Sequence, residues 1–202
     1  MLHDGPTDAD TTIILAHGAG AGMDSPAMEA FAVGLAGAGL RVVRFEFPYM
    51  QRRRQTGKRG GPDRLPVLME SWRRAVATAG GGRLVIGGKS MGGRIASMIA
   101  DDIGVHGLVC LGYPFHPPGR PEKLRTAHLA ALQTPTLIVQ GTRDTFGKPD
   151  EVEGYDLSDT INIVWLDDGD HSFRPRKASG RTLEQNLAEA IAAMTEFVRA
   201  LA

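Results

Sequence analysis

A serine stands at the centre of the short glycine-flanked segment Gly88-Lys89-Ser90-Met91-Gly92. The segment follows an apolar run, Leu84 to Ile86, that predicts a buried strand, and it precedes residues that can form a helix through Ile99. Glycine on both sides permits a sharp strand-to-helix turn, because larger side chains there would collide with the neighbouring strand and helix. Such a turn would lift the Ser90 hydroxyl clear of the sheet, where it could act as a nucleophile.

A serine hydroxyl needs a base to take its proton, and a histidine in that role needs a carboxylate to orient it. Asp144 follows the predicted strand Thr136 to Gln140, and His171 follows the predicted strand Ile161 to Leu166. The order serine, acid, histidine along the chain is that of α/β-hydrolases. We therefore predict a catalytic triad of Ser90, Asp144 and His171.

Two backbone N–H groups are candidates for an oxyanion hole. The N–H of Met91 follows the nucleophile at a helix N-terminus. The second donor should come from the loop His17 to Gly20, which directly follows the predicted strand Thr12 to Ala16, and we assign it to Ala19. Within this loop we expect the histidine to orient the backbone by hydrogen bonds rather than to act chemically. The residues predicted to bind substrate are His17, Gly18 and Tyr113.

The turn at Ser90 has two competing interpretations. Gly88-Lys89-Ser90 matches the end of the phosphate-binding pattern G-x-x-x-x-G-K-[ST], but the first glycine of that pattern would fall on Arg83. An ordinary turn without chemistry stays open for this motif taken alone, and the positions of Asp144 and His171 count against it.

The run Asp167 to His171 could be read as a set of metal ligands. It supplies no second histidine or cysteine at a ligand spacing and no complete calcium-loop pattern, so we predict no metal and no cofactor. Among the other histidines, none but His171 follows the last predicted strand, which favours His171 as the base.

The composition fits one globular domain spanning residues 1–202. The 23 basic residues balance the 23 acidic ones, which gives no argument for nucleic acid or a membrane surface as partner. Cys110 is the only cysteine, the N-terminus has no leader pattern, and no apolar run approaches the roughly 18 residues of a membrane span. We expect a cytoplasmic protein acting on a small-molecule acyl substrate.

Short runs rich in β-branched residues alternate with longer amphipathic segments, as in a sheet with crossover helices. This predicts an α/β fold with a mostly parallel sheet of about six strands and helices on both faces. The predicted strands are Thr12 to Ala16, Val42 to Phe47, Leu84 to Ile86, Gly107 to Leu111, Thr136 to Gln140 and Ile161 to Leu166. The predicted helices begin at Pro26, at Pro66 and after the capping box Thr182 to Gln185.

The segment Arg52 to Arg64 holds six basic residues, three glycines and a single acid. This composition predicts a long exposed loop. Because the loop would emerge where parallel sheets bind ligands, attraction of an acidic substrate is an alternative to a merely solvated loop.

The motifs HGAG, FPYM, GGKSMGGR, GTRDTFG and DGDHSF, in that order between residues 12 and 200, resemble the α/β-hydrolase superfamily. More narrowly, the chain is similar to small bacterial hydrolases related to dienelactone hydrolases and to the hydrolase-like domain of animal KANSL-type chromatin subunits. The resemblance implies Ser90 as nucleophile, Asp144 and His171 as its partners, and an oxyanion hole formed by Met91 and the HGAG loop. Dienelactone hydrolases carry a cysteine in place of this serine, so their lactone substrate is not implied.

Larger relatives insert a helical cap where this chain has only Gly112 to Gln133, so we expect an open site without a large cap domain. About eleven residues precede the first predicted strand, so the antiparallel strand pair that opens the superfamily sheet should be missing or shortened.

The residues favour a serine hydrolase that cleaves an ester or thioester of an acyl group. Acyl transfer or perhydrolysis with the same triad is one alternative. A non-catalytic interaction module with the same fold is another, because one fold can host many functions.

Overall fold

The computed structural model describes residues 1–80 and 82–201. Seven strands form one sheet in the order β1-β3-β2-β4-β5-β6-β7, and every neighbouring pair is parallel except β1 with β3. The mostly parallel α/β sheet predicted from the sequence is therefore confirmed. The strands are β1 (Leu2–Asp4), β2 (Thr11–Ala16), β3 (Arg41–Phe45), β4 (Arg83–Lys89), β5 (Gly107–Leu111), β6 (Thr136–Gly141) and β7 (Ile161–Leu166).

The first strand, β1, was not among the six strands predicted. It is three residues long, too short to carry a periodic pattern, and it pairs antiparallel with β3 at the edge of the sheet. An ion pair of 2.9 Å between the Asp4 carboxylate and the Arg44 guanidinium ties the two strands together. We expected the antiparallel strand pair that opens the superfamily sheet to be missing or shortened. The structure has one short antiparallel strand, β1, at this position.

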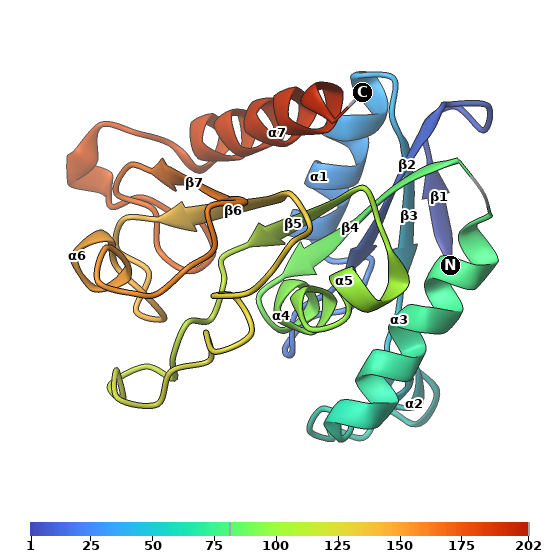
Figure 1. The fold of residues 1–202 in the computed structure, drawn as a ribbon, viewed down its shortest axis with the longest axis horizontal. Helices are drawn as coiled ribbons and strands as arrows, with labels where there is room; N and C mark the ends of the chain where they lie inside the picture. The colour runs from blue at the N-terminus through green and yellow to red at the C-terminus, as the bar shows by residue number, and fades with distance from the viewer. Residues whose placement is uncertain (81, 202) are drawn as a thin grey trace.

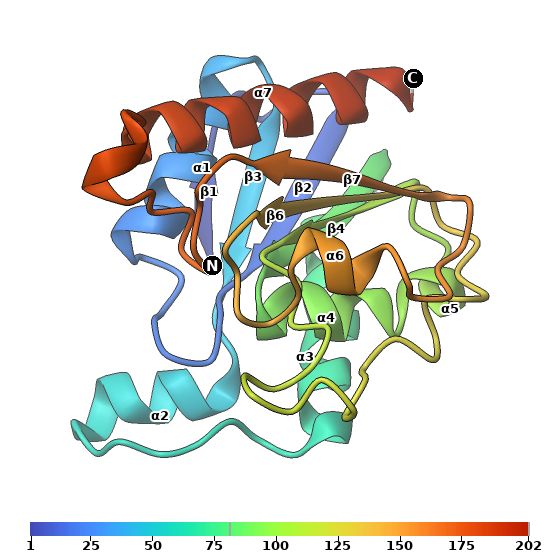
Figure 2. The same ribbon diagram turned by 90° about the vertical axis from the view of Figure 1, so that its left-hand side faces the viewer.

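Helices cover both faces of the sheet, as predicted (Figure 1). Helices α1 and α7 lie on one face, and α3, α4 and α5 lie on the other, as a second view confirms (Figure 2). The helices are α1 (Pro26–Gly37), α2 (Pro48–Thr56), α3 (Leu65–Ala79), α4 (Met91–Ser97), α5 (Ala100–Ile103), α6 (Pro149–Val152) and α7 (Leu183–Ala200), with a 3-10 turn at Lys177–Ser179.

Strand β2 shows how the sheet divides the core into two layers. Successive side chains of a strand point to opposite faces, so Ile13 and Leu15 pack against α1 and α7 while Ile14 packs on the side of α3 and α4. All three side chains are fully buried. This continuous apolar run explains why a strand covered on both faces could be recognised in the sequence.

The capping box predicted for the last helix is present at the start of α7. The N–H of Gln185 donates to the Thr182 hydroxyl at 3.2 Å, and the N–H of Thr182 donates to the Gln185 side chain at 2.9 Å. These two bonds satisfy N–H groups that have no acceptor within the helix. At α1, in contrast, Ser25 occupies the N-cap position without a side-chain capping bond.

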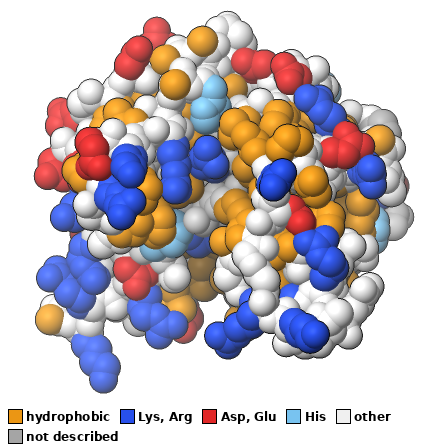
Figure 3. Space-filling model, turned by 90° about the horizontal axis from the view of Figure 1, so that it is seen from below, with side chains coloured by type: hydrophobic (Ala, Val, Ile, Leu, Met, Phe, Trp, Pro, Cys, Tyr) orange, Lys and Arg blue, Asp and Glu red, His pale blue; other side chains and the backbone are white. Residues whose placement is uncertain are grey.

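The basic segment is not the long loop predicted, because its first part belongs to α2. Pro48 begins this helix and Gly57 ends it in the left-handed conformation, with φ of 69°. The charges of α2 are partly paired: Arg54 binds Asp24 and Glu46, and Arg52 binds Asp63. Within the basic segment Arg52 to Arg64, irregular backbone is limited to residues 57–64. Seen from the α2 end, the surface shows more Lys and Arg than Asp and Glu side chains (Figure 3).

In residues 1–80 and 82–201, no large cap covers the carboxyl ends of the strands. Residues 112–135, which connect β5 to β6, form turns and irregular backbone without a helix. Among the helices in the described part of the chain, none combines the length and the apolar character needed to cross a membrane.

Candidate active site

Ser90 lies at the tip of the turn between β4 and α4, in a strained backbone conformation with φ of 50° and ψ of −113°. The flanking glycines have no room for a side chain. A Cβ added to Gly88 would lie 2.2 Å from the carbonyl oxygen of Ala16, and one added to Gly92 would lie 2.5 Å from the same atom. The close approach of β2 therefore requires glycine at both positions, and the strain at Ser90 is held by the packed elements around it.

The structure brings Ser90, His171 and Asp144 together at the carboxyl ends of β4, β7 and β6. The Nε2 atom of His171 lies 2.9 Å from the Ser90 hydroxyl oxygen, and its Nδ1 atom lies 2.7 Å from an Asp144 carboxylate oxygen. Since a carboxylate can only accept, Nδ1–H donates to Asp144, which leaves Nε2 as the acceptor for the Ser90 proton. The order of the bonds is the one that nucleophilic catalysis by serine requires.

Asp144 is fully buried, and three donors surround its carboxylate. Besides His171, the Gln140 side-chain amide donates to one carboxylate oxygen at 3.0 Å, and the N–H of Phe146 donates to the other at 2.9 Å. The Gln140 amide is itself fixed, because its oxygen accepts a bond of 2.6 Å from the N–H of Tyr113. These bonds compensate the burial of a charge and hold it in one orientation.

The loop that carries His171 is anchored on both sides of the imidazole. Asp168 precedes it with a φ of 51°, and a hydrogen bond from Arg176 lowers the pKa of this carboxyl to about 2. Phe173 follows with a φ of 66°, and its carbonyl accepts a bond of 2.8 Å from the Asn186 side chain of α7. The Phe146 ring lies 4.2 Å from the imidazole, centre to centre, and limits its rotation.

Two backbone N–H groups near Ser90 are the candidates for an oxyanion hole. Met91 is the first residue of α4, so its N–H has no acceptor within the helix. The Tyr49 hydroxyl donates to the carbonyl oxygens of Gly18 at 3.2 Å and of Ala19 at 3.0 Å. In a trans peptide the N–H points opposite to the C=O, so these bonds turn the N–H groups of Ala19 and Gly20 away from Tyr49. This geometry fits the oxyanion donors assigned to Met91 and Ala19.

A family model described as an alpha/beta hydrolase domain matches residues 9–199 of the chain. The chain belongs to this family. The α/β-hydrolase domain is also similar in structure to three solved proteins. The first is a serine hydrolase without a lid from Xanthomonas campestris, at 20% identity and a TM-score of 0.64, with 98% of this chain and 87% of the other covered.

The second is a serine hydrolase homologue from Coxiella burnetii, at 21% identity and a TM-score of 0.67, with 99% of this chain and 89% of the other covered. The third is an esterase domain from Rhodothermus marinus, at 14% identity and a TM-score of 0.69, with 98% of this chain and 91% of the other covered. Likeness at these identities shows a shared fold.

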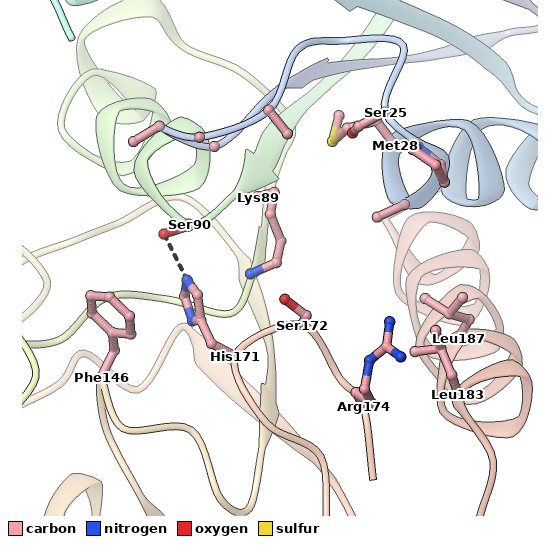
Figure 4. Close-up of a pocket in the computed structure, with 16 residues that line it drawn as sticks. Ser25, Met28, Lys89, Ser90, Phe146, His171, Ser172, Arg174, Leu183 and Leu187 are labelled. Carbon is pink, nitrogen blue, oxygen red and sulfur yellow. Dashed lines mark hydrogen bonds between the residues drawn. The ribbon is translucent and has the colours of Figure 1, made fainter. Parts of the chain in front are cut away.

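A cavity of about 630 Å³ opens beside Ser90 in this α/β-hydrolase domain (Figure 4). One side is the loop 18–21, and the far wall is formed by Met28 of α1 with Leu183 and Leu187 of α7. Ser90 and His171 line the opposite end, so a group held in the cavity is next to the nucleophile. Its volume is within the usual range for small-molecule sites.

Of the three residues predicted to bind substrate, only Gly18 lines the cavity. His17 is fully buried; its Nδ1 lies 2.7 Å from the Gly18 carbonyl oxygen and its Nε2 accepts from the N–H of Phe47 at 3.1 Å. Burial lowers the pKa of His17, which favours the neutral ring that this pair of bonds needs. The structure therefore gives it the orienting role and corrects its placement among substrate contacts.

Tyr113 is a second correction. Its side chain is fully buried, and its hydroxyl donates to the Arg125 carbonyl at 3.1 Å instead of facing the cavity. Its contribution to the site is through the backbone, which holds the Gln140 amide behind Asp144. The sequence did not show on which side of the backbone the Tyr113 ring would point.

Sequence reasoning missed Tyr49, Gln140 and Lys89. Tyr49 lies in the FPYM motif, and its role follows only from the fold that places α2 beside the loop 17–20. Lys89 was visible as a charged residue within an otherwise apolar and glycine-rich turn. In residues 1–80 and 82–201, no group of three or more His, Cys, Asp or Glu side chains is arranged to hold a metal ion.

Proposed function

We propose that this α/β-hydrolase domain is a serine hydrolase that cleaves an ester or thioester of an acyl group through Ser90, His171 and Asp144. The observation that carries the proposal is the continuous chain of hydrogen bonds from Asp144 through His171 to Ser90 at the end of a cavity. The serine hydrolases of Xanthomonas campestris and Coxiella burnetii that share its fold support the reaction class.

The reaction begins with the carbonyl carbon of the substrate next to the Ser90 oxygen. His171 Nε2 takes the hydroxyl proton as the oxygen attacks, and Asp144 stabilises the imidazolium that forms. The negative charge on the carbonyl oxygen is held by the N–H groups of Met91 and Ala19. The tetrahedral intermediate then releases the alcohol or thiol, which takes the proton from His171 and leaves an acyl group on Ser90.

Water completes the cycle. His171 removes a proton from a water molecule, the resulting hydroxide attacks the acyl-serine, and the Ser90 oxygen leaves with the proton returned by His171. The products are the carboxylic acid and the alcohol or thiol. Within the part of the chain that the structure describes, no cap covers the site, which favours access of water as the acceptor. The same acyl-serine could also pass its acyl group to another acceptor.

Hydrolysis of 4-nitrophenyl acetate and of an acetyl thioester by wild type and by Ser90→Ala tests this function. We expect wild type to release product with saturation kinetics and Ser90→Ala to lose at least about a thousandfold in kcat. Ser71→Ala, at a half-buried position of α3 that does not line the cavity, is the matched control and should retain wild-type rates. Equal rates for wild type and Ser90→Ala would show that this serine is not the nucleophile.

A further inference from the structure

The ammonium group of Lys89 is buried beside the triad and has no hydrogen-bond partner in the described part of the chain. Lys89 directly precedes the nucleophile, and its side chain reaches from the end of β4 into the space between His171 and Ser172 (Figure 4). The nitrogen lies 5.5 Å from the centre of the Phe173 ring, on its face. An ammonium can donate three hydrogen bonds, so all three remain available.

Gly112 leaves the room that this ammonium occupies. A Cβ added to Gly112 would lie 2.6 Å from the Lys89 nitrogen and 3.3 Å from Nδ1 of His171. The ammonium and the imidazole therefore flank one small space, and the charge sits close to the reacting groups.

The two carboxylates nearest to Lys89 are engaged elsewhere. Asp144 accepts from His171, Gln140 and the N–H of Phe146. Asp170 accepts from the N–H groups of Ser172 and Arg174 through one carboxylate oxygen, which shapes the turn after His171. Their charges favour the protonated lysine at a distance, but neither carboxylate accepts a hydrogen bond from it.

The cavity itself offers no negative charge to Lys89. Of the described residues that line it, none is Asp or Glu, while Lys89 and Arg174 carry positive charge and Ser172 carries a hydroxyl. The guanidinium of Arg174 lies farther along the cavity, next to Leu183 (Figure 4). The positive charges of Lys89 and Arg174 thus have no carboxylate among the described lining residues. For the buried Lys89 this is costly, because a charge removed from water without a partner is unfavourable.

Resting on the proposed hydrolase function, we propose that the substrate is an ester or thioester whose acyl chain carries a second carboxylate, and that this carboxylate pairs with the ammonium of Lys89. The methylene chain of such a substrate would pack on Met28 and Leu187. The substrate carboxylate would accept hydrogen bonds from the Lys89 ammonium, which has no acceptor in the described part of the chain. Hydrolysis yields a dicarboxylate and the alcohol or thiol.

The test compares two esters that differ in one charge: the mono(4-nitrophenyl) ester of adipic acid and the same compound with its free carboxyl capped as a methyl ester. Release of 4-nitrophenol is followed at pH 7 with spontaneous hydrolysis subtracted. We expect wild type to prefer the charged ester in kcat/KM by at least about tenfold, the effect of one charge-assisted hydrogen bond. If wild type hydrolyses the capped ester as well as the charged ester, or better, this result alone overturns the inference.

Lys89→Met keeps the length and apolar stem of the side chain and removes the charge. We expect the ratio of the two kcat/KM values to fall to near one in this variant, and the exposed control Lys123→Met to keep the wild-type ratio. A Lys89→Met protein that retains the preference overturns the assignment to Lys89. Hydrolysis of neither ester by wild type would overturn the proposed hydrolase function itself, whereas hydrolysis of both without preference overturns only the substrate class.

Discussion

Asp144 is the residue on which the orientation of the His171 imidazole depends. Its carboxylate is buried and accepts from His171, from Gln140 and from the N–H of Phe146, so it cannot turn away from the imidazole without losing bonds on its other side. The imidazole in turn presents Nε2 to Ser90 at 2.9 Å. Gln140 and the N–H of Phe146 therefore help to determine where the proton between His171 and Ser90 lies, because they fix the Asp144 carboxylate that orients the imidazole.

Asp144→Asn tests this arrangement. The amide nitrogen can donate to the imidazole and so favours the tautomer with its proton on Nε2, which can no longer accept from Ser90. We expect kcat to fall by about 10³ to 10⁴ with a smaller effect on KM, measured by ester hydrolysis. Asp167→Asn is the control, because Asp167 lies in the His171 loop with an exposed side chain. Equal losses in the two variants would contradict the role given to Asp144.

The charge of Lys89 predicts a pH dependence of substrate preference. Burial lowers the pKa of this ammonium to about 8, although the carboxylates of Asp144 and Asp170 oppose that shift. His171 is a further titratable group close to the amine, because its Nδ1 atom and the Lys89 nitrogen both lie near Gly112. Because a lysine is charged only below its pKa, the preference for the carboxylate ester should be largest below pH 8 and decline above it.

The measurement is the ratio of kcat/KM for the charged and capped esters between neutral and alkaline pH. Taking the ratio cancels the titration of His171, which affects both esters alike. A ratio that stays constant well above pH 8 would show that the neutral amine suffices and that charge pairing is not the cause.

At this scale the sequence predicted the three residues of the hydrogen-bonded chain better than the residues that surround them. Spacing and order were sufficient to select Ser90, Asp144 and His171, because each follows a predicted strand. The direction of a side chain is not contained in such a pattern, and for this reason Tyr113 was placed at the substrate although its ring is buried.

Helix α2 acts on the site through the loop 17–20. Tyr49 donates to the carbonyls of Gly18 and Ala19, and Arg53 donates to that of Gly20 at 3.2 Å. Burial raises the pKa of Tyr49 to about 12, so the hydroxyl keeps the proton that it donates. Helix α2 therefore has a structural role in holding the loop to which we assign the second oxyanion donor.

Tyr49→Phe should weaken that loop without removing a group that touches the substrate. We expect kcat to fall by about tenfold or more with little change in KM, less than the full loss of one oxyanion donor. Tyr155→Phe is the matched control, since the Tyr155 hydroxyl is buried, has no hydrogen-bond partner among residues 1–80 and 82–201, and is not part of the cavity. A Tyr49→Phe enzyme with an unchanged kcat would show that the hydroxyl does not position the oxyanion donor.

Substitutions of glycine test how closely the turn between β4 and α4 packs against β2. A Cβ at Gly92 would lie 2.5 Å from the Ala16 carbonyl oxygen, whereas a Cβ at Gly37, in the last turn of α1, would meet nothing within 4 Å. We expect Gly92→Ala to reduce the free energy of unfolding by about 1–3 kcal/mol and Gly37→Ala to raise it by up to about 1 kcal/mol. Urea unfolding measures both, and equal effects would contradict the close approach of β2.

Element boundaries were predictable where a capping pattern or a run of β-branched residues marked them, as in α7 and β2. They were missed where the pattern was short or ambiguous. Strand β1 has three residues, and α2 has a strongly polar sequence that resembles a loop, although Pro48 and Gly57 mark its ends.

The whole molecule brings distant parts of the chain to one edge of the sheet. Ser90 and His171 are 81 positions apart, and they meet because β4 and β7 are parallel strands of one sheet and both residues follow carboxyl ends. The alternation of strands and helices was enough to predict that most strands are parallel, since a crossover connection returns the chain to the same end of the sheet. The residues that line the cavity depend on the packing of α1 beside α7. No local sequence pattern specifies this packing.

Labelling by a fluorophosphonate tests the central claim most directly, because the reagent reacts with a serine only when a base and an oxyanion hole activate it. We predict that wild type takes up one label, that peptide mapping places it on Ser90, and that Ser90→Ala takes up none. Ser172→Ala, which lacks the hydroxyl of another serine in the cavity, should still be labelled on Ser90. A folded wild type that stays unlabelled, or a Ser90→Ala variant labelled as well as wild type, would contradict the account.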